Sequence, residues 1–457
     1  MAGYGDIRTA RRGEALIEAI SGLGTVNLRR LGAGRAGEMG AHRFLSSPHA
    51  SVEAIIDTAS ERTREAAQGL DVVCAQDTTE INFAGSHGKR GGLGPGGNGD
   101  VPGLFVHALI SIDATSEAVL GLSGARTWTR SEQPLAPRHL RAPKDKESSK
   151  WLEGAQRAQQ ALAGASTITV VGDRESDIFH LFSARPEGVE LVVRARQDRP
   201  LARPRAGAQD DVVAQTRWMH EAVANAPRED TIAVAVAPKG PGDRGRTATV
   251  EVRRQRVQLA PARGHSGEPV EVFIVEAREI NPPEPAPNAR PPLHWVLIAT
   301  QDRPGAQIIQ LYKLRWRIEE VFRCLKSDGL AIEDTQVRDP ERLFRLVALA
   351  MCAAARTMQL VDARDGSTRP DTDILDPVFR TAVKALSDKL EGKTERQKNP
   401  HPVYTLAYVA WVCARLGGWN CYYKPPGPKT MRTGWSVLTQ TLTGYTLALN
   451  STTNQIP

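Results

Sequence analysis

The chain has 457 residues, of which 40% are hydrophobic and 24% charged, and its formal net charge at pH 7 is +7. The length predicts two to four domains, and the composition is that of a soluble globular protein. The positive charge favours a polyanionic partner such as nucleic acid. No signal-peptide core and no run of about 18 or more apolar residues are present, so we expect an intracellular protein that does not use a membrane.

Residues 1–70 are expected to form several short helices, with Ser51 as the N-cap of the one that begins near Val52. Arginines at positions 8, 11 and 43 occur in this segment. Two interpretations stay open from these residues alone: a DNA-docking module, or an ordinary helical subdomain with solvated arginines.

From Asp71 the pattern predicts strand, strand, strand, helix, strand, helix, with an acid on the first strand and another at the end of the fourth. These acids are Asp77, in VVCAQDTTE, and Asp173, in TVVGDRESD. A carboxylate that follows an apolar strand is costly unless it meets a cation, and acids on neighbouring strands can share one metal site. The alternative for Asp173 is a plain helix cap.

Residues 197–300 interrupt this order with a β-rich insertion. Four alternating segments in it predict strands: TIAVAVA, TATVEVRRQRVQL, VEVFIVEA and HWVLIAT. A proline-rich stretch before the last of them, NPPEPAPNARPP, is expected to be an extended surface loop.

The stretch Tyr312–Lys326, YKLRWRIEEVFRCLK, is predicted to form one helix with an apolar stripe. A neighbouring polar face carries one carboxylate, Glu319, and four side chains that are cationic or phenolic. These four are Tyr312, Arg315, Arg323 and Lys326. We expect a metal at Glu319 and phosphates on either side of it, with the cations contacting phosphate. The alternative is a surface salt bridge between Glu319 and Arg315 or Arg323.

Two apolar helices follow, LFRLVALAMCAAARTMQLV and YTLAYVAWVCARLGG. Exposed helices of this kind would aggregate, so they either pack on the core, which we favour, or form a dimer interface.

These acids, in three separate blocks, point to phosphoryl transfer. Magnesium binds carboxylate oxygens from a few acids on different elements, and two such ions can activate a nucleophilic oxygen and stabilise a leaving oxygen. Asp77, Asp173 and Glu319 are therefore the candidate catalytic and metal-binding residues.

The same blocks resemble a known family. The spacing Y-x2-R-x3-E-x6-K is met at Tyr312, Arg315, Glu319 and Lys326, and QDTTE, GDRESD, GAHRFLSSP and ARLGGWN match other blocks of it. The chain is similar to bacterial DDE transposases of the YREK subgroup, typified by insertion-sequence-four elements and the composite kanamycin-resistance transposon. The resemblance spans almost the whole sequence.

This resemblance implies an α/β protein with an RNase H-like catalytic core, residues 71–364, that contains the β-rich insertion at about 197–300. A helical DNA-end-binding domain, 1–70, and a helical dimerisation domain, 365–457, would flank it. Two Mg²⁺ ions, with Mn²⁺ as a substitute, would bind Asp77, Asp173 and Glu319. Water would then cut the transposon end, and the freed 3′-hydroxyl would form a hairpin on the opposite strand before strand transfer into target DNA.

It also implies the DNA contacts. Phosphates near the cut would be bound by a group of side chains on the helix and on one strand: Tyr312, Arg315, Arg323, Lys326 and Arg194. Trp295 would stack on a flipped base, its alternative being a plain core tryptophan. Arg8, Arg11 and Arg43 would recognise the end.

The implied protein is a bacterial, cytoplasmic, nucleoid-associated enzyme that binds double-stranded DNA as a homodimer. A leading segment of familiar relatives is expected to be absent before GDIRTARR, which leaves a second interpretation: a catalytically inactive DNA-binding regulator or domesticated derivative. Another RNase H-like nuclease, such as a resolvase, is a third interpretation, disfavoured by the YREK spacing and the β-rich insertion.

Overall fold

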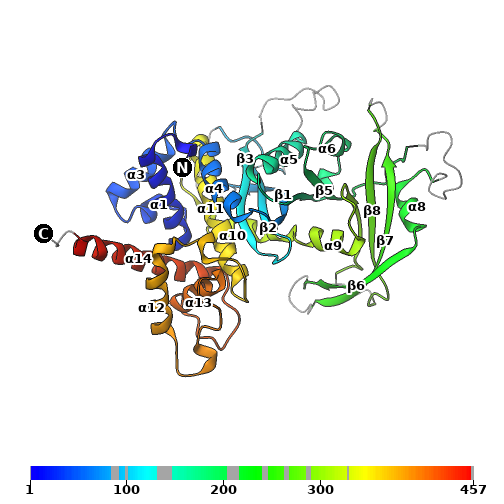
Figure 1. Ribbon diagram of the computed structural model, residues 1–457. Helices are drawn as coiled ribbons and strands as arrows, with labels where there is room; N and C mark the ends of the chain where they lie inside the picture. The colour runs from blue at the N-terminus through cyan, green and yellow to red at the C-terminus, as the bar shows by residue number, and fades with distance from the viewer. Residues whose placement is uncertain are drawn as a thin grey trace.

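A computed structural model describes residues 2–83, 92–97, 101–130, 147–202, 216–238, 245–261, 267–284, 290–326 and 329–453. Within them the chain is a mixed α/β protein whose N-terminal and C-terminal helices gather at one end of a long sheet (Figure 1). The N-terminal helices are α1 (Ile7–Leu23), α2 (Leu28–Leu31), α3 (Arg35–Leu45) and α4 (Val52–Ala66). Ser51 caps α4 as predicted, since its hydroxyl accepts a hydrogen bond from the Ala54 amide at 3.1 Å.

The next elements follow the predicted order. They are β1 (Asp71–Asn82), β2 (Gly103–Asp113), β3 (Val119–Trp128), α5 (Ser149–Ala161), β4 (Thr167–Gly172), α6 (Phe179–Ser183) and β5 (Val189–Arg194). The insertion holds the four predicted strands, β6 (Arg228–Val236), β7 (Arg246–Leu259), β8 (Val270–Glu279) and β9 (His294–Ala299), and a short helix that the pattern did not predict, α8 (Met219–Ala224).

The nine strands within the described residues form one sheet in the order β3-β2-β1-β4-β5-β9-β8-β7-β6. β1 pairs with β2 antiparallel and with β4 parallel, so the strand that bears Asp77 and the strand that Asp173 follows are direct neighbours. β9 pairs with β5 on one side and β8 on the other, both antiparallel. The insertion therefore extends the core sheet instead of forming a separate one (Figure 1).

Side chains of β1 alternate between two hydrophobic clusters, as the period of two in a strand requires. Val72 and Cys74 pack in the cluster that holds Trp151 of α5, whereas Val73 and Ala75 pack in the larger cluster. The larger cluster also takes residues from α9 (Gly305–Lys313), α10 (Trp316–Lys326) and α11 (Pro340–Ala363). The two sides of the sheet are thus covered by different helices.

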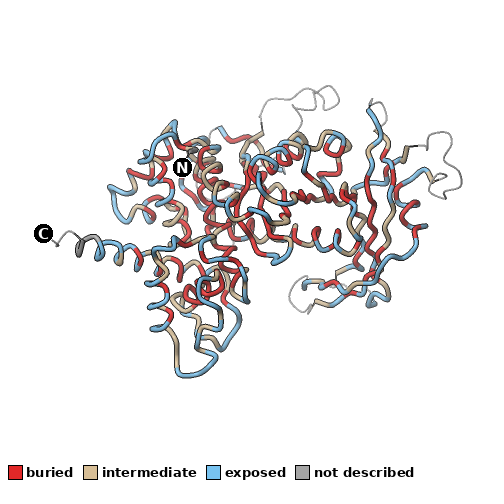
Figure 2. The backbone as a smooth tube through the Cα atoms, viewed as in Figure 1, coloured by how far each residue is buried: buried red, intermediate tan, exposed pale blue. Residues whose placement is uncertain are grey.

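α11 is the central helix of the protein. It begins at Pro340 behind an Asp339 cap whose carboxylate accepts from the Arg342 amide at 2.9 Å. Its apolar window is long enough for a membrane span, but 83% of that window is buried inside the protein (Figure 2). α13 (Leu406–Leu416) is buried as well, which confirms core packing for both apolar helices.

Two further α-helices pack against α13, and the second of them also packs against α11. They are α12 (Arg380–Leu390) and α14 (Pro428–Thr453). α14 also contacts α1, where the Trp435 indole donates to Glu18 at 2.8 Å. The predicted domain boundaries at 70 and 364 stay predictions.

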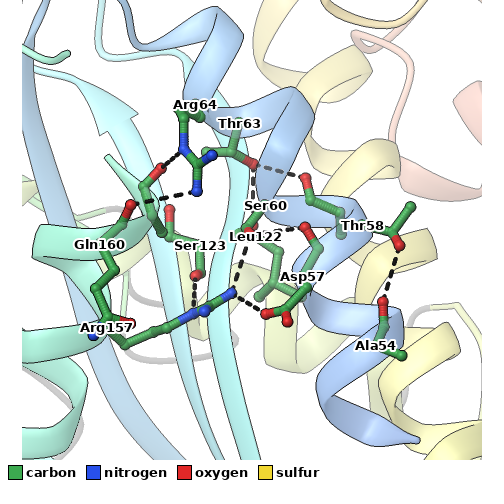
Figure 3. Close-up of polar contacts among 12 residues, drawn as sticks. Ala54, Asp57, Thr58, Ser60, Thr63, Arg64, Leu122, Ser123, Arg157 and Gln160 are labelled. Atoms are coloured by element: carbon green, nitrogen blue, oxygen red, sulfur yellow. Dashed lines mark hydrogen bonds and ion pairs between the residues drawn. The ribbon is translucent and has the colours of Figure 1, made fainter. Parts of the chain in front are cut away.

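The N-terminal helices are tied to the sheet by polar contacts between α4, α5 and β3 (Figure 3). Arg157 of α5 donates to the Asp57 carboxylate at 2.5 Å and to the Ser123 carbonyl at 3.2 Å. The Thr63 hydroxyl donates to the Leu122 carbonyl at 3.0 Å. α4 is thereby fixed to the edge strand and to the helix that covers it.

The stretch Tyr312–Lys326 is not the single helix that the periodicity predicts. α9 ends at Lys313, α10 begins at Trp316, and a tight turn joins them. In that turn the Arg315 amide bonds to the Tyr312 carbonyl at 3.1 Å and the Ile318 amide to the Arg315 carbonyl at 3.2 Å. Each bond joins residues that are three positions apart, as in a 3₁₀ helix, and not four apart as in an α-helix. Such a turn changes the direction in which the side chains point.

The glycine-rich tract after β1 lies largely outside the described residues, as does part of the proline-rich stretch 281–292. Within the described part of the tract, the Gly97 amide donates to Glu80 at 2.6 Å.

Candidate active site

Asp77 lies on β1, on the side of the sheet that faces α10, because it alternates in step with Val73 and Ala75. The pKa of Asp77 is raised to about 6: burial raises it most, the charge of Arg315 lowers it, and the charges of Asp173 and Glu319 raise it. The three acids of the sequence prediction therefore meet closely enough to act on one another electrostatically.

Asp173 follows directly after β4. The parallel register pairs Ala75 with Val171, so Asp77 and Asp173 come two residues later on adjacent strands, at the same edge of the sheet. The Asp173 carboxylate also accepts from the Glu175 amide at 2.8 Å and so caps a short 3₁₀ helix, Arg174–Ser176. Asp173 is therefore a helix cap that also lies at the position next to Asp77, and its role as a metal ligand stays a prediction.

Glu319 lies on α10, and Arg315 joins it to Asp77. The Arg315 guanidinium donates to Asp77 at 2.8 Å and to Glu319 at 3.2 Å. The alternative interpretation, a salt bridge between Glu319 and Arg315, is present here, while phosphate binding by Arg315 stays a prediction. The turn before α10 accounts for the pairing. It places the guanidinium beside a buried carboxylate that requires a counter-charge.

A metal ion was expected between these acids. Within the described residues no group of three or more His, Cys, Asp and Glu side chains has the arrangement of a formed metal site. The donor set itself suits a hard divalent cation, because it consists of carboxylates from different elements whose mutual repulsion raises the pKa of Asp77. A cation that binds here would compete with Arg315 for Asp77 and Glu319.

Aromatic and cationic side chains lie next to Arg315 and extend the candidate site. Tyr312 is buried, its hydroxyl accepts hydrogen bonds from Arg315 and Arg194, and burial raises its pKa. The ring of Trp295 on β9 meets the Tyr312 ring edge to face, with centroids 5.5 Å apart. Arg194, at the end of β5, also donates to the His294 carbonyl at 3.4 Å.

Five further predicted DNA-binding residues lie on α1, α3 and α10. Arg323 and Lys326 extend along α10, where Arg323 is exposed and Lys326 partly so. Arg8 and Arg11 on α1, and Arg43 on α3, are exposed on helices that pack against α11. Their roles stay predictions.

The sequence interpretation missed one cation beside the acids, Lys150 of α5. It is only 7% exposed, and its ammonium lies 3.8 Å from the Glu175 carboxylate. The available signal was weak, since a lysine beside a tryptophan at the start of an amphipathic helix is ordinarily a solvated side chain.

A second missed contact anchors α10 to α11. Arg317 of α10 pairs with Asp362 of α11 at 3.1 Å and with Glu320 at 3.2 Å. One Asp362 oxygen is buried and, among the described residues, has no hydrogen-bond partner. Burial therefore outweighs the arginine and raises the pKa of Asp362 to about 7.

This buried acid predicts a pH dependence of stability. Because its pKa is raised on folding, the native state binds the proton more tightly than the unfolded state between about pH 4 and pH 7. The free energy of unfolding of the wild type should therefore fall relative to that of Asp362→Asn as pH rises through this window, by a few kcal/mol. Urea unfolding of both proteins at several pH values measures the difference, and a difference that does not change with pH would contradict it.

Part of the chain matches a known protein family. Residues 153–356 match the family model described as the transposase DDE domain. The matched segment is less than half of the chain and contains Asp173, the insertion and Glu319, whereas Asp77 precedes it. Families of this kind act on DNA and generally use divalent metal ions. The match supports a DDE transposase family for this chain.

Proposed function

We propose that the protein is a cut-and-paste DNA transposase of the YREK subgroup. The observation that carries the proposal is the meeting of Asp77, Asp173 and Glu319 from β1, β4 and α10, with the second and third acid inside the matched transposase segment. Three antiparallel strands followed by two parallel ones, β1 to β5, support an RNase H-like core.

Asp77, Asp173 and Glu319 would hold two Mg²⁺ ions, for which Mn²⁺ would substitute. Bound there, the metal would lower the pKa of an attacking water and neutralise charge on the scissile phosphate. The carboxylates must be ionised for this, and at neutral pH a pKa of about 6 leaves Asp77 mostly ionised.

The chain's own cations and aromatics would hold the DNA. Arg315 is close enough to the acids to bind a phosphate once it exchanges its carboxylate partners, and Tyr312 and Arg194 are linked to it by hydrogen bonds. Arg323 and Lys326 would bind phosphates further along α10. Water attack would free a 3′-hydroxyl, whose attack on the opposite strand would form the hairpin that precedes joining to target DNA.

The enzyme would assemble on the transposon ends through its helical segments. Arg8, Arg11 and Arg43 would bind the terminal inverted repeats, and the enzyme would act as a homodimer through residues 365–457, in the bacterial cytoplasm at the nucleoid. One observation favours the second candidate, a DNA-binding regulator that no longer cuts: Arg315 already neutralises two of the three acids.

One experiment separates these functions. The purified full chain is incubated with a duplex that carries the inverted repeat found beside the reading frame, with Mg²⁺ or with EDTA, and the products are run on a denaturing gel. The transposase yields metal-dependent nicks at the repeat end followed by hairpins. Binding without any cleavage would support the regulator and overturn the transposase.

Trp295 should affect the hairpin step more than the first nick. Its ring is only partly buried and touches Tyr312, so it can offer a face to a flipped base, and such stacking contributes about 1–3 kcal/mol. We expect Trp295→Ala to slow hairpin formation about 5- to 100-fold with a smaller change in nicking. Equal losses at both steps, compared in one time course, would mean that the tryptophan is structural.

A further inference from the structure

Lys150 is placed on the side of the sheet opposite to Arg315. Its helix, α5, packs through Trp151 in the cluster that contains Val72 and Cys74, whereas α10 packs in the other cluster. Both cations nevertheless act on Asp77. Burial lowers the pKa of Lys150, and the charges of Glu175, Glu147, Asp77 and Asp173 oppose that shift.

Aromatic rings hold this ammonium group in position. It lies 5.2 Å from the ring centre of Trp151 and 5.6 Å from that of Trp128. Trp128 is itself stacked on Phe105, with ring centres 5.5 Å apart and planes 21° from parallel. Trp128 also lies 5.6 Å from the Arg126 guanidinium, so its ring holds cations and does not offer an open face to a base.

The bonding of the ammonium group is incomplete. An ammonium has three donors, yet among the described residues its one carboxylate neighbour, Glu175, lies at 3.8 Å, beyond hydrogen-bonding distance. Glu175 is exposed, with 66% of its side chain accessible, and is a weak partner. The Lys150 ammonium is held by rings, has no protein acceptor within hydrogen-bonding distance among the described residues, and is available to an anion that arrives from solvent.

We propose that Lys150 is a phosphate-binding residue of the active site, which contacts the DNA backbone on the side of the acids opposite to Arg315. This inference rests on the proposed transposase function, since the anion is a phosphodiester held beside Asp77 and Asp173. The scissile region would then be bound between one cation from each side of the sheet.

The test is the salt dependence of DNA binding. Affinity of the full chain for the inverted-repeat duplex is measured by fluorescence anisotropy in EDTA, where the metal-dependent cut cannot occur, between about 50 and 200 mM salt. Loss of one phosphate contact reduces the slope of log affinity against log salt by about 0.9. We expect this reduction and an about 3- to 30-fold weaker affinity at low salt for Lys150→Met, and little change in slope for Lys150→Arg.

Two further variants keep the result interpretable. Lys384→Met removes an exposed lysine of α12 that pairs with Asp388 at 2.8 Å, and it should leave the slope unchanged. Lys150→Gln keeps a polar tip if the methionine variant does not fold, and thermal melting checks both. An unchanged slope in a folded Lys150 variant would overturn the proposal and make the lysine a counter-charge for the acids.

The two proposals fail in different ways. If the wild type binds the duplex but never cuts it with Mg²⁺, the transposase function fails. If it cuts with Mg²⁺ while a folded Lys150→Met keeps both its slope and its cleavage rate, only the role of Lys150 is refuted.

Discussion

Replacing Glu319 with glutamine is expected to reduce metal-dependent DNA cleavage by at least about 100-fold while binding of the DNA end changes little. Glutamine keeps the size of the side chain but removes the charge that would hold the metal. The fold should survive, because Asp77 keeps its 2.8 Å contact with Arg315 and Glu319 lies on the partly exposed side of α10. Initial rates of nicking with Mg²⁺ measure the effect.

The matched control is Glu341→Gln. That carboxylate is 73% exposed at the start of α11, and Arg345 lies 3.9 Å from it. Its loss should leave cleavage unchanged, which shows that the effect of Glu319 does not come from net charge. Undiminished cleavage by the Glu319 variant would remove the carboxylate from the catalytic set.

Arg315→Met should make the stability of the protein depend on divalent metal. The side chains of Arg315 and Asp77 are each only 15% exposed, so loss of the guanidinium leaves a buried carboxylate near two other acids, at a cost of about 2–4 kcal/mol. Mg²⁺ should restore more stability to this variant than it adds to the wild type, because the ion replaces the missing positive charge.

The pH dependence gives a second readout of the same variant. Arg315 lowers the pKa of Asp77, so its removal raises that pKa above about 6 and extends the range in which the native state retains the proton. The variant should therefore lose little stability at pH 5 and more at pH 8, as measured by urea unfolding in EDTA. Arg43→Met, on the exposed surface of α3, is the control. Equal losses at both pH values would mean that Arg315 acts through packing alone.

The sequence was most informative where periodicity and chemistry agreed. Apolar or alternating segments predicted every described strand, and the apolar context of Asp77 and Asp173 favoured a shared site, which fits their position on neighbouring strands. A strand pattern has a period of two over several residues, and a carboxylate after an apolar run is costly without a partner, so both signals are local.

The parts that the sequence could not predict depend on contacts between distant segments. The helical spacing of Tyr312 to Lys326 is nearly the same for one helix and for two helices joined by a tight turn, and only packing decides between them. The pairing of Arg315 with Asp77 crosses 238 positions of sequence. Lys150 and Asp362 have ordinary local contexts, and burial by other elements gives them their electrostatic importance.

The position of β9 has a consequence for how the chain folds. Arg194, which ends β5, contacts His294, the first residue of β9, across 100 positions of sequence. Strands β6 to β8 lie within that interval, so a long loop must close before β9 can join the two halves of the sheet. Such high contact order slows folding, and until closure β5 presents an unpaired edge. Correct assembly of the catalytic edge and resistance to aggregation during synthesis therefore depend on the same late strand.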